Sequence, residues 1–243
     1  MIKCVIFDFG DTLVITKRKT MGEHVLEYAR FLKKHGYRFN KSDIVAAHKV
    51  TEEKWRVFGE ETKQTSKQLW EKTFIAALGV KPTKKLCSSM EKDYFNFRLK
   101  NDKLVPNALQ ILNKLKQAGL RLCVVTNTKT NANYILAKKF GLFKYFDYFL
   151  MSHKEGTPKS ELKIFYALLR KLNKNKKNKI KPNECLMVGN SLNEDTVASQ
   201  IGMKTAILTK QSYVDKKKKY FEPNYYIDDL KEILIIVDKF TEV

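Results

Sequence analysis

Polar residues that could do chemistry occur in four short stretches, each beside a predicted strand or helix. They are Asp8 after an apolar run, Thr126 and Asn127 after another, Lys159 before a helical segment, and 190–195 after a third apolar run. A carboxylate can act as a nucleophile or a cation ligand, and hydroxyl and ammonium groups can bind an anion. Taken singly, each residue has an ordinary explanation as a turn former, a helix cap or a solvated lysine. Their combination is the informative feature.

Short apolar runs alternate with amphipathic segments, and this pattern predicts the elements that position those residues. Apolar runs predict strands at 3–7, 120–125, 148–151, 184–188, 205–208 and 225–227. Three- and four-residue spacing predicts helices at 106–119, 132–140, 161–172, 194–201 and 230–237. The alternation predicts an α/β fold with a Rossmann-like, doubly wound parallel sheet. Ligands bind such sheets at the carboxyl ends of the strands, where the polar residues occur.

One long stretch interrupts this alternation. From about Thr20 to Lys100 apolar residues recur at three- or four-residue steps, which predicts four amphipathic helices with breaks near Gly36, Gly59 and Gly79. We therefore expect an α/β core formed by residues 1–14 and 101–243, and an inserted all-helical, four-helix domain formed by residues 15–100.

The composition predicts a folded, basic, cytoplasmic protein. Hydrophobic residues make up 43% of the 243 residues, and no apolar run reaches the roughly 18 residues of a membrane span, so we expect no membrane partner. The apolar N-terminal run is short and stops at Asp8, which argues against a signal peptide. None of the four cysteines has a CxxC spacing, so we expect buried thiols rather than a zinc site.

The net charge of +21 comes mostly from lysines spread along the whole chain, with local runs at 171–181 and 216–219 that predict exposed loops. Lysine is a point charge and lacks the planar donor array with which arginine contacts phosphates and bases. We therefore do not expect a nucleic-acid partner, although the basic surface leaves one open. The sequence gives no indication of the oligomeric state.

Together the four stretches resemble, in order and along the whole chain, the motifs of the haloacid dehalogenase superfamily. DFGDTL from Asp8 resembles the first motif, an aspartate nucleophile in a DxDGT(L) loop, and VVTN ending at Asn127 resembles the second. KSELKIF from Lys159 resembles the third, KPDPxIF, and GNSLNED ending at Asp195 resembles the fourth, GDSxxxD. The helical insert lies where the first type of cap domain lies in this family.

The resemblance implies a Mg²⁺-dependent hydrolase, most similar to the phosphatases, that acts on a small phosphorylated substrate. Asp8 would be the nucleophile and would form an aspartyl-phosphate that water then hydrolyses. The metal-binding residues would be Asp8, the backbone carbonyl of Gly10, Asn190 and Asp195. Mg²⁺ prefers oxygen ligands and retains several waters, so few protein ligands are needed.

The family pattern also implies how the phosphate would be held. Thr126 and the backbone N–H of Asn127 would bind its oxygens, and Lys159 would neutralise the phosphate and Asp8 together. The helical cap would close over the site and contact the leaving group, but the cap sequence does not identify the substrate.

Two positions depart from the family pattern. The phosphatases carry an aspartate as general acid and base two residues after the nucleophile, where this chain has Gly10; Asp11 follows and is either a displaced acid or a turn residue. Asn190 replaces the usual aspartate of the fourth motif, which removes a formal charge that would bind Mg²⁺.

These departures leave two alternatives open. A 2-haloacid dehalogenase also attacks through an aspartate and needs no acid for a halide leaving group, but it uses no Mg²⁺ and its halide-binding residues have no clear match here. A catalytically weak regulatory or polyanion-binding homologue would fit the altered motifs and the basic surface.

Overall fold

The computed structural model describes residues 1–16, 21–61, 67–128, 131–214 and 219–238. The chain divides into two compact units. The first contains residues 1–16, 103–128 and 133–243, and the second contains residues 17–102 with 129–132. No helix in the described ranges combines the length and apolarity needed to cross a membrane.

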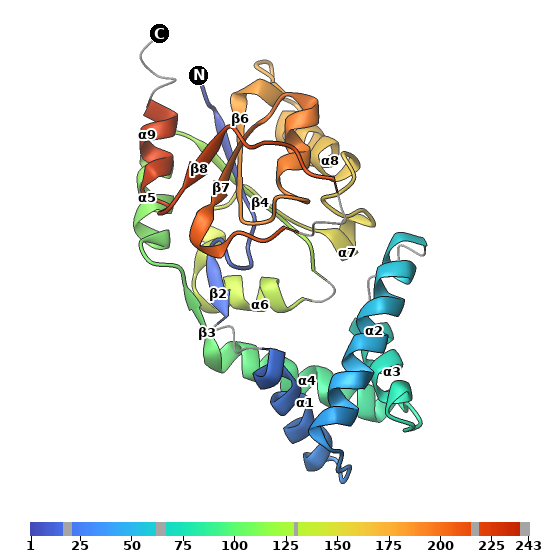
Figure 1. The fold of residues 1–243 in the computed structure, drawn as a ribbon. Coiled ribbons are helices and arrows are strands. Elements are labelled where there is room, and N and C mark those ends of the chain that lie inside the picture. The colour runs from blue at the N-terminus through green and yellow to red at the C-terminus, as the bar shows by residue number, and fades with distance from the viewer. Residues whose placement is uncertain (17–20, 62–66, 129–130, 215–218, 239–243) are drawn as a thin grey trace. The chain divides into compact units, whose positions relative to one another are not determined.

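The first unit is built on a six-stranded sheet with the strand order β5-β4-β1-β6-β7-β8 (Figure 1). Every neighbouring pair in it is parallel. The strands are β1 (Cys4–Phe7), β4 (Arg121–Thr126), β5 (Tyr148–Met151), β6 (Cys185–Gly189), β7 (Lys204–Leu208) and β8 (Tyr225–Ile227). The predicted α/β fold with a parallel, Rossmann-like sheet is therefore confirmed, and all six predicted strands are present.

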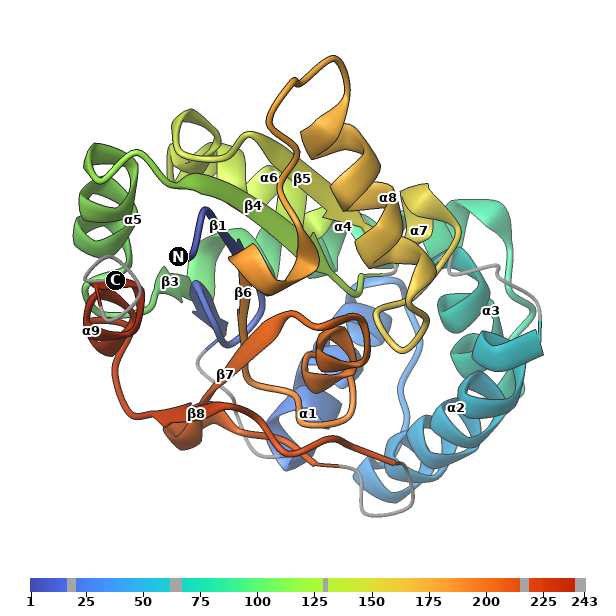
Figure 2. The ribbon, with the colours of Figure 1, turned by 90° about the horizontal axis from the view of Figure 1, so that it is seen from above.

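Helices cover both faces of this sheet. The helix α8 (Lys163–Asn173) and the 3-10 segment η3 (Thr196–Ile201) pack on one face. Figures 1 and 2 show α5 (Ala108–Gln117) and α9 (Glu232–Asp238) on the opposite side. The remaining elements of this unit are α6 (Ala132–Lys139), α7 (Ser152–Glu155), η1 (Leu142–Lys144), η2 (Pro182–Glu184) and η4 (Thr209–Gln211).

Alternation along the strands explains why these sequences form a buried sheet. Successive side chains of a strand point to opposite faces, so a strand covered on both sides is apolar throughout. All of β1 and β6 is buried. Cys4, Cys123 and Cys185 lie in one apolar cluster with α8, and all four cysteines of the chain are buried, free thiols.

The described residues of the second unit form four helices, as predicted. They are α1 (Met21–Lys34), α2 (Lys41–Glu61), α3 (Lys67–Ala77) and α4 (Lys84–Asn101). Leu32, Ile44, Phe74 and Met90, one residue from each helix, belong to a common apolar cluster. The side chains of residues 21–26, 52–61 and 67–71 lie outside what the structure describes, so the predicted apolar spacing is not tested over those residues.

The break predicted near Gly59 agrees with the structure, because α2 ends two residues later, at Glu61. Two other details of the prediction are wrong. The helix predicted at 194–201 is a 3-10 segment that begins at Thr196. The strands β2 (Val14–Thr16) and β3 (Asp102–Leu104), which form a separate two-stranded sheet, were not predicted.

Candidate active site

The predicted site residues gather at the carboxyl ends of three adjacent strands. Thr126 is the last residue of β4, Asp8 follows β1 directly, and Asn190 follows β6 directly. Because β1 lies between β4 and β6, Asp8 is flanked on both sides by the other two strand ends. The Asp8 N–H donates to the Val188 carbonyl at 2.8 Å, which continues the β1–β6 pairing up to the site.

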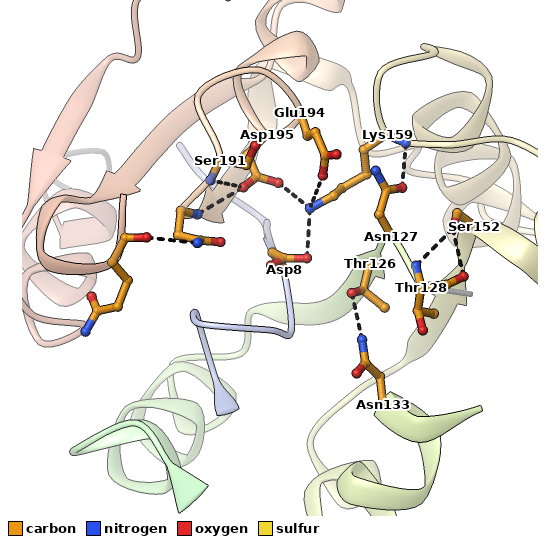
Figure 3. A network of polar contacts seen from close by, with 12 residues as sticks. Asp8, Thr126, Asn127, Thr128, Asn133, Ser152, Lys159, Ser191, Glu194 and Asp195 are labelled. Carbon is orange, nitrogen blue, oxygen red and sulfur yellow. Dashed lines mark hydrogen bonds and ion pairs between the residues drawn. The ribbon is translucent and has the colours of Figure 1, made fainter. Parts of the chain in front are cut away.

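The side chain of Lys159 joins this cluster from the segment between α7 and α8 (Figure 3). Its Nζ lies 2.8 Å from Asp8 Oδ1 and 2.6 Å from Asp195 Oδ1. Lys159 is 1% exposed, Asp8 6% and Asp195 0%. A buried ammonium group is stable only when it is paired. The two carboxylates provide that pairing and fix the ammonium beside Asp8.

Asp195 is held by backbone as well as by the lysine. Its Oδ2 accepts hydrogen bonds from the backbone N–H groups of Asn190 at 3.0 Å and Ser191 at 2.8 Å. A Cβ at Gly189 would lie 2.0 Å from the same oxygen. Only glycine therefore allows the carboxylate to pack against the end of β6. Both oxygens of Asp195 are engaged, one with the lysine and one with the backbone.

Burial and the neighbouring charges set the protonation of the pair. Burial raises the pKa of Asp8 from 3.8 to about 6; Lys159 lowers this pKa and Asp195 raises it. Burial would lower the pKa of Lys159, but the carboxylates of Asp195 and Asp8 outweigh it and raise this pKa above its ordinary value. At neutral pH Lys159 is therefore charged and Asp8 is mostly ionised.

Glu194 adds a third carboxylate to this cluster. Its Oε2 lies 3.9 Å from Lys159 Nζ, and its side chain is 39% exposed, unlike those of Asp8 and Asp195. One ammonium thus faces three acidic side chains. The site has an excess of negative charge, which favours the binding of a cation there.

A layer of hydrogen bonds supports the residues predicted to hold phosphate. Asn133 Nδ2 donates to Thr126 Oγ1 at 3.1 Å, and the Lys159 N–H donates to Asn127 Oδ1 at 2.9 Å. Ser152 Oγ accepts from the Thr128 N–H at 3.0 Å and donates to the Thr128 carbonyl at 3.2 Å. The end of β4 is therefore fixed to α6, to the start of α7 and to the lysine segment.

The residues predicted to bind Mg²⁺ are a chemically suitable but sparse set. An isolated β-bridge joins Gly10 and Val14. Its hydrogen bonds run from the Val14 N–H to the Phe9 carbonyl and from the Asp11 N–H to the Val14 carbonyl, so they do not use the Gly10 carbonyl. Asn190 Nδ2 donates to the Gln211 carbonyl at 2.9 Å, so its Oδ1 faces the other way.

Among the described residues, no group of three His, Cys, Asp or Glu side chains has the arrangement of a metal site. The oxygens of Asp8, Gly10 and Asn190 are the types that Mg²⁺ accepts, and the excess of carboxylates fits its charge. Asp195 fits less well as a direct ligand, because both of its oxygens are already engaged.

Asp11 occupies the turn that follows Asp8. Its backbone has a φ of 57°, in the left-handed region, and its N–H donates to the Val14 carbonyl at 2.8 Å. Aspartate is one of the few residues other than glycine that adopt this conformation readily. The turn role of Asp11 is therefore visible in the backbone, and its chemical role remains a prediction.

Comparison with known proteins agrees with this geometry. Residues 2–212 match the family of haloacid dehalogenase-like hydrolases. The chain belongs to this family. The similarity inferred from the four motifs is therefore confirmed.

Relatives of this haloacid dehalogenase-like hydrolase include two proteins named glyceraldehyde 3-phosphate phosphatase. The relative from Methanopyrus kandleri is 25% identical over 243 residues, which cover 98% of this chain and 97% of the relative. The relative from Methanothermobacter thermautotrophicus is 30% identical over 148 residues, which cover 58% of this chain and 63% of the relative. The match to the second relative thus spans less than two thirds of its length.

The fold is also found among solved structures. A haloacid dehalogenase-type hydrolase from Bacillus subtilis, crystallised with magnesium, has a TM-score of 0.69 and 19% sequence identity to this haloacid dehalogenase-like hydrolase. The match covers 98% of this chain and 99% of the other. At this identity, the similarity concerns the fold.

Two residues of the site, Asn133 and Ser152, were not singled out from the sequence. Gly189 and Glu194 lie within the fourth motif, but no role was predicted for them. Asn133 lies seven positions after Thr126 in the sequence, in the first turn of the following helix. A polar residue in the first turn after a site-bearing strand is a usable signal for a supporting contact. Ser152 lies beyond the next strand, and only the folded structure shows that it contacts Thr128.

Proposed function

We propose that this haloacid dehalogenase-like hydrolase is a Mg²⁺-dependent phosphate-monoester hydrolase that acts on a small phosphorylated metabolite. The observation that carries the proposal is the buried ammonium of Lys159, 2.8 Å from Asp8 and 2.6 Å from Asp195. A carboxylate that attacks an anionic phosphate needs positive charge beside it, because charge repulsion otherwise opposes the approach. Lys159 provides that charge at the position of the nucleophile.

The relatives support a sugar phosphate as the substrate class. Both relatives described above carry the name glyceraldehyde 3-phosphate phosphatase, and one of these aligns over nearly the full length of both chains. We therefore propose a phosphorylated sugar of a few carbons as the substrate.

The metal site that we propose uses the carboxylate of Asp8, the carbonyl of Gly10 and the side-chain oxygen of Asn190, with Asp195 as a partner through water. When bound, Mg²⁺ would screen the negative charge of the phosphate and polarise its oxygens. Asn190 contributes no formal charge, so the excess of negative charge from Glu194 and Asp195 would help to retain the ion.

The residues of this chain would divide the reaction as follows. An Asp8 oxygen forms a bond to phosphorus while the ester P–O bond breaks, which gives an aspartyl-phosphate and the alcohol. Thr126 and the Asn127 N–H hold phosphate oxygens, and Lys159 compensates the charge on the phosphate. Water then attacks the phosphorus of the aspartyl-phosphate, so that inorganic phosphate leaves and Asp8 is regenerated.

The leaving alcoholate must gain a proton, and Gly10 supplies none. Asp11 is the proposed donor, displaced by one residue from the usual position. If it has this role, Asp11→Ala should reduce turnover of glyceraldehyde 3-phosphate by about 10²–10⁴-fold and turnover of p-nitrophenyl phosphate far less, since p-nitrophenolate leaves without a proton. If Asp11→Ala leaves the turnover of each substrate unchanged from the wild type, Asp11 has only the role of a turn residue.

The proposed function is tested by phosphate release from p-nitrophenyl phosphate and from glyceraldehyde 3-phosphate, with Mg²⁺ and with EDTA. We expect Mg²⁺-dependent turnover that Asp8→Asn abolishes. Asp43→Asn, in the first turn of α2, is the matched control, because it removes a carboxylate from an exposed residue outside the proposed site.

Other outcomes would support the alternatives. Metal-independent release of chloride from a 2-haloacid would show that the protein is a dehalogenase. Absence of any turnover, together with salt-sensitive binding of an oligonucleotide, would replace it with a polyanion-binding role.

A further inference from the structure

The hydroxyl of Thr126 has a buried partner beneath the proposed phosphate position. Thr126 ends β4, and Asn133 is the second residue of α6. Asn133 Nδ2 donates to Thr126 Oγ1 at 3.1 Å, and the two residues are 6% and 1% exposed (Figure 3). A polar contact buried to this degree is specific, because water does not compete for it.

The direction of this hydrogen bond determines what the hydroxyl can do next. A threonine hydroxyl has one proton to donate and two lone pairs that accept. Asn133 occupies a lone pair and leaves the proton for another acceptor. The oxygens of a phosphate are acceptors, so they match the proton that remains.

The backbone around Thr126 is fixed by other contacts. Asn127 Oδ1 accepts the Lys159 N–H, and Ser152 bonds to both the N–H and the carbonyl of Thr128. Because these contacts hold the backbone, the hydroxyl orientation is what can still vary at Thr126. The amide of Asn133 restricts that orientation.

We infer that Asn133 is a positioning residue that sets the Thr126 hydroxyl as a hydrogen-bond donor to a phosphate oxygen. The inference rests on the proposed function, because it requires that Thr126 binds phosphate. Asn133 acts through Thr126 and makes no contact with the substrate in this scheme.

Asn133→Asp tests the inference with almost no change in shape. An ionised carboxylate only accepts hydrogen bonds, so the Thr126 proton would turn toward Asp and away from the ligand. Binding of inorganic phosphate, measured by titration calorimetry with Mg²⁺ present, should weaken by about 10- to 100-fold, the usual effect of losing a hydrogen bond to a charged group. KM for the ester should rise in parallel, with a smaller change in kcat.

A repulsive charge could weaken binding without any role of the hydroxyl, so the test includes the same change in a Thr126→Val background. If Asn133 acts through Thr126, Asn133→Asp adds at most about 2-fold to the effect of Thr126→Val. Asn131→Asp, an exposed change two residues away, controls for charge near the site and should leave phosphate binding unchanged. Asn133→Ala, which frees the hydroxyl without reversing it, should weaken binding by about 3- to 10-fold, and it carries the test if the aspartate variant does not fold.

Each outcome has a definite meaning. The inference is overturned if the wild type, Asn133→Asp and Asn133→Ala bind phosphate with equal affinity. It is also overturned if Asn133→Asp weakens phosphate binding equally in the wild-type and Thr126→Val backgrounds. If the wild type does not bind phosphate at all, the proposed function fails and the inference fails with it. Phosphate binding that is normal in the wild type but independent of Asn133 overturns the inference alone.

Discussion

At the scale of single residues, the site depends on a glycine that does no chemistry. A Cβ at Gly189 would lie 2.0 Å from Asp195 Oδ2 and 2.2 Å from Asp195 Cγ. The carboxylate would have to move, and Lys159 would lose one of its two buried partners.

We therefore expect Gly189→Ala to reduce turnover by at least about 10²-fold, since displacement of a positioned group by about 1 Å can have this effect. Breaking a buried ion pair should also lower the free energy of unfolding by about 3–5 kcal/mol. Kinetics and urea unfolding measure the two effects. Gly36→Ala, at a helix end in the other unit, is the control for turnover only, because the φ of 86° at Gly36 makes alanine unfavourable there and lowers stability by itself. Wild-type turnover in Gly189→Ala would contradict the prediction.

Ionisation of the buried Asp8 carboxyl lowers the free energy of unfolding. Its pKa is about 6 in the folded protein against an ordinary 3.8. Between these values the folded state binds more protons than the unfolded state, so the free energy of unfolding falls as the pH rises through this window. Above about pH 6 the loss is complete and is on the order of 3 kcal/mol.

Asp8→Asn does not titrate and should escape this loss. Asp8→Asn also removes one of the two carboxylates that pair with Lys159, which lowers its stability by an amount that does not depend on the titration of Asp8. In EDTA, urea unfolding should therefore show that the wild type loses up to the amount above relative to the variant between about pH 4 and pH 7.5. A difference that stays constant over this range would show that the burial of Asp8 does not destabilise the protein.

The order of the four polar stretches and their resemblance to the family motifs predicted that Asp8, Lys159 and Asp195 belong to one region. In the structure the ammonium of Lys159 lies within 2.8 Å of a carboxylate oxygen of each aspartate. The contribution of Glu194 and Asn133 could not be predicted in the same way. Each depends on the direction of one side chain in the folded protein, which the residue type does not specify.

At the scale of elements, the strands were predictable because they are buried on both faces and therefore apolar throughout. β3 was not predictable, because its residues Asp-Lys-Leu form no apolar run, whereas the equally short β8 reads Tyr-Tyr-Ile. β2 pairs only with β3, outside the six-stranded sheet, so the alternation of strands and helices did not indicate it. The 3-10 form of residues 196–201 also depends on packing, since α and 3-10 helices share similar sequences.

The lysine-rich loop between α8 and β6 is closed by a single side chain. Asn173 Nδ2 donates to the Ile180 carbonyl at 2.9 Å, and Asn173 Oδ1 accepts the Ile180 N–H at 2.7 Å. Residues 174–179 between them are exposed, as predicted for this run; the run at 216–219 lies mostly outside the described residues.

Asn173→Ala should therefore lower the free energy of unfolding by about 1–3 kcal/mol, through two lost hydrogen bonds. Asn173→Asp keeps the acceptor and loses the donor, so its effect should be intermediate. Asn178→Asp, in the exposed part of the loop, is the matched control. Equal stability of all four proteins in urea would show that the clamp contributes nothing.

At the scale of the whole molecule, the net charge of +21 acts on an anionic substrate before it binds. Such a field raises the encounter rate, and salt screens it with a Debye length of about 10 Å at 0.1 M. We expect kcat/KM for a phosphate ester to fall several-fold between about 20 and 300 mM KCl, with kcat nearly constant. Steady-state kinetics at fixed Mg²⁺ measure this effect, and a kcat/KM independent of salt would indicate that the surface charge has no part in substrate capture.

Each unit contains at least one buried thiol whose alkylation can be used to measure the opening of that unit. Cys4, Cys123 and Cys185 are sealed in the α/β unit and Cys87 in the helical unit, so a soluble alkylating reagent reaches each only when the surrounding unit opens. Pulsed alkylation followed by peptide mass spectrometry would thus read the opening of the two units separately, in the native sequence and without an added probe. The order in which these cysteines become modified on mild denaturation is the order in which the parts of the molecule come apart.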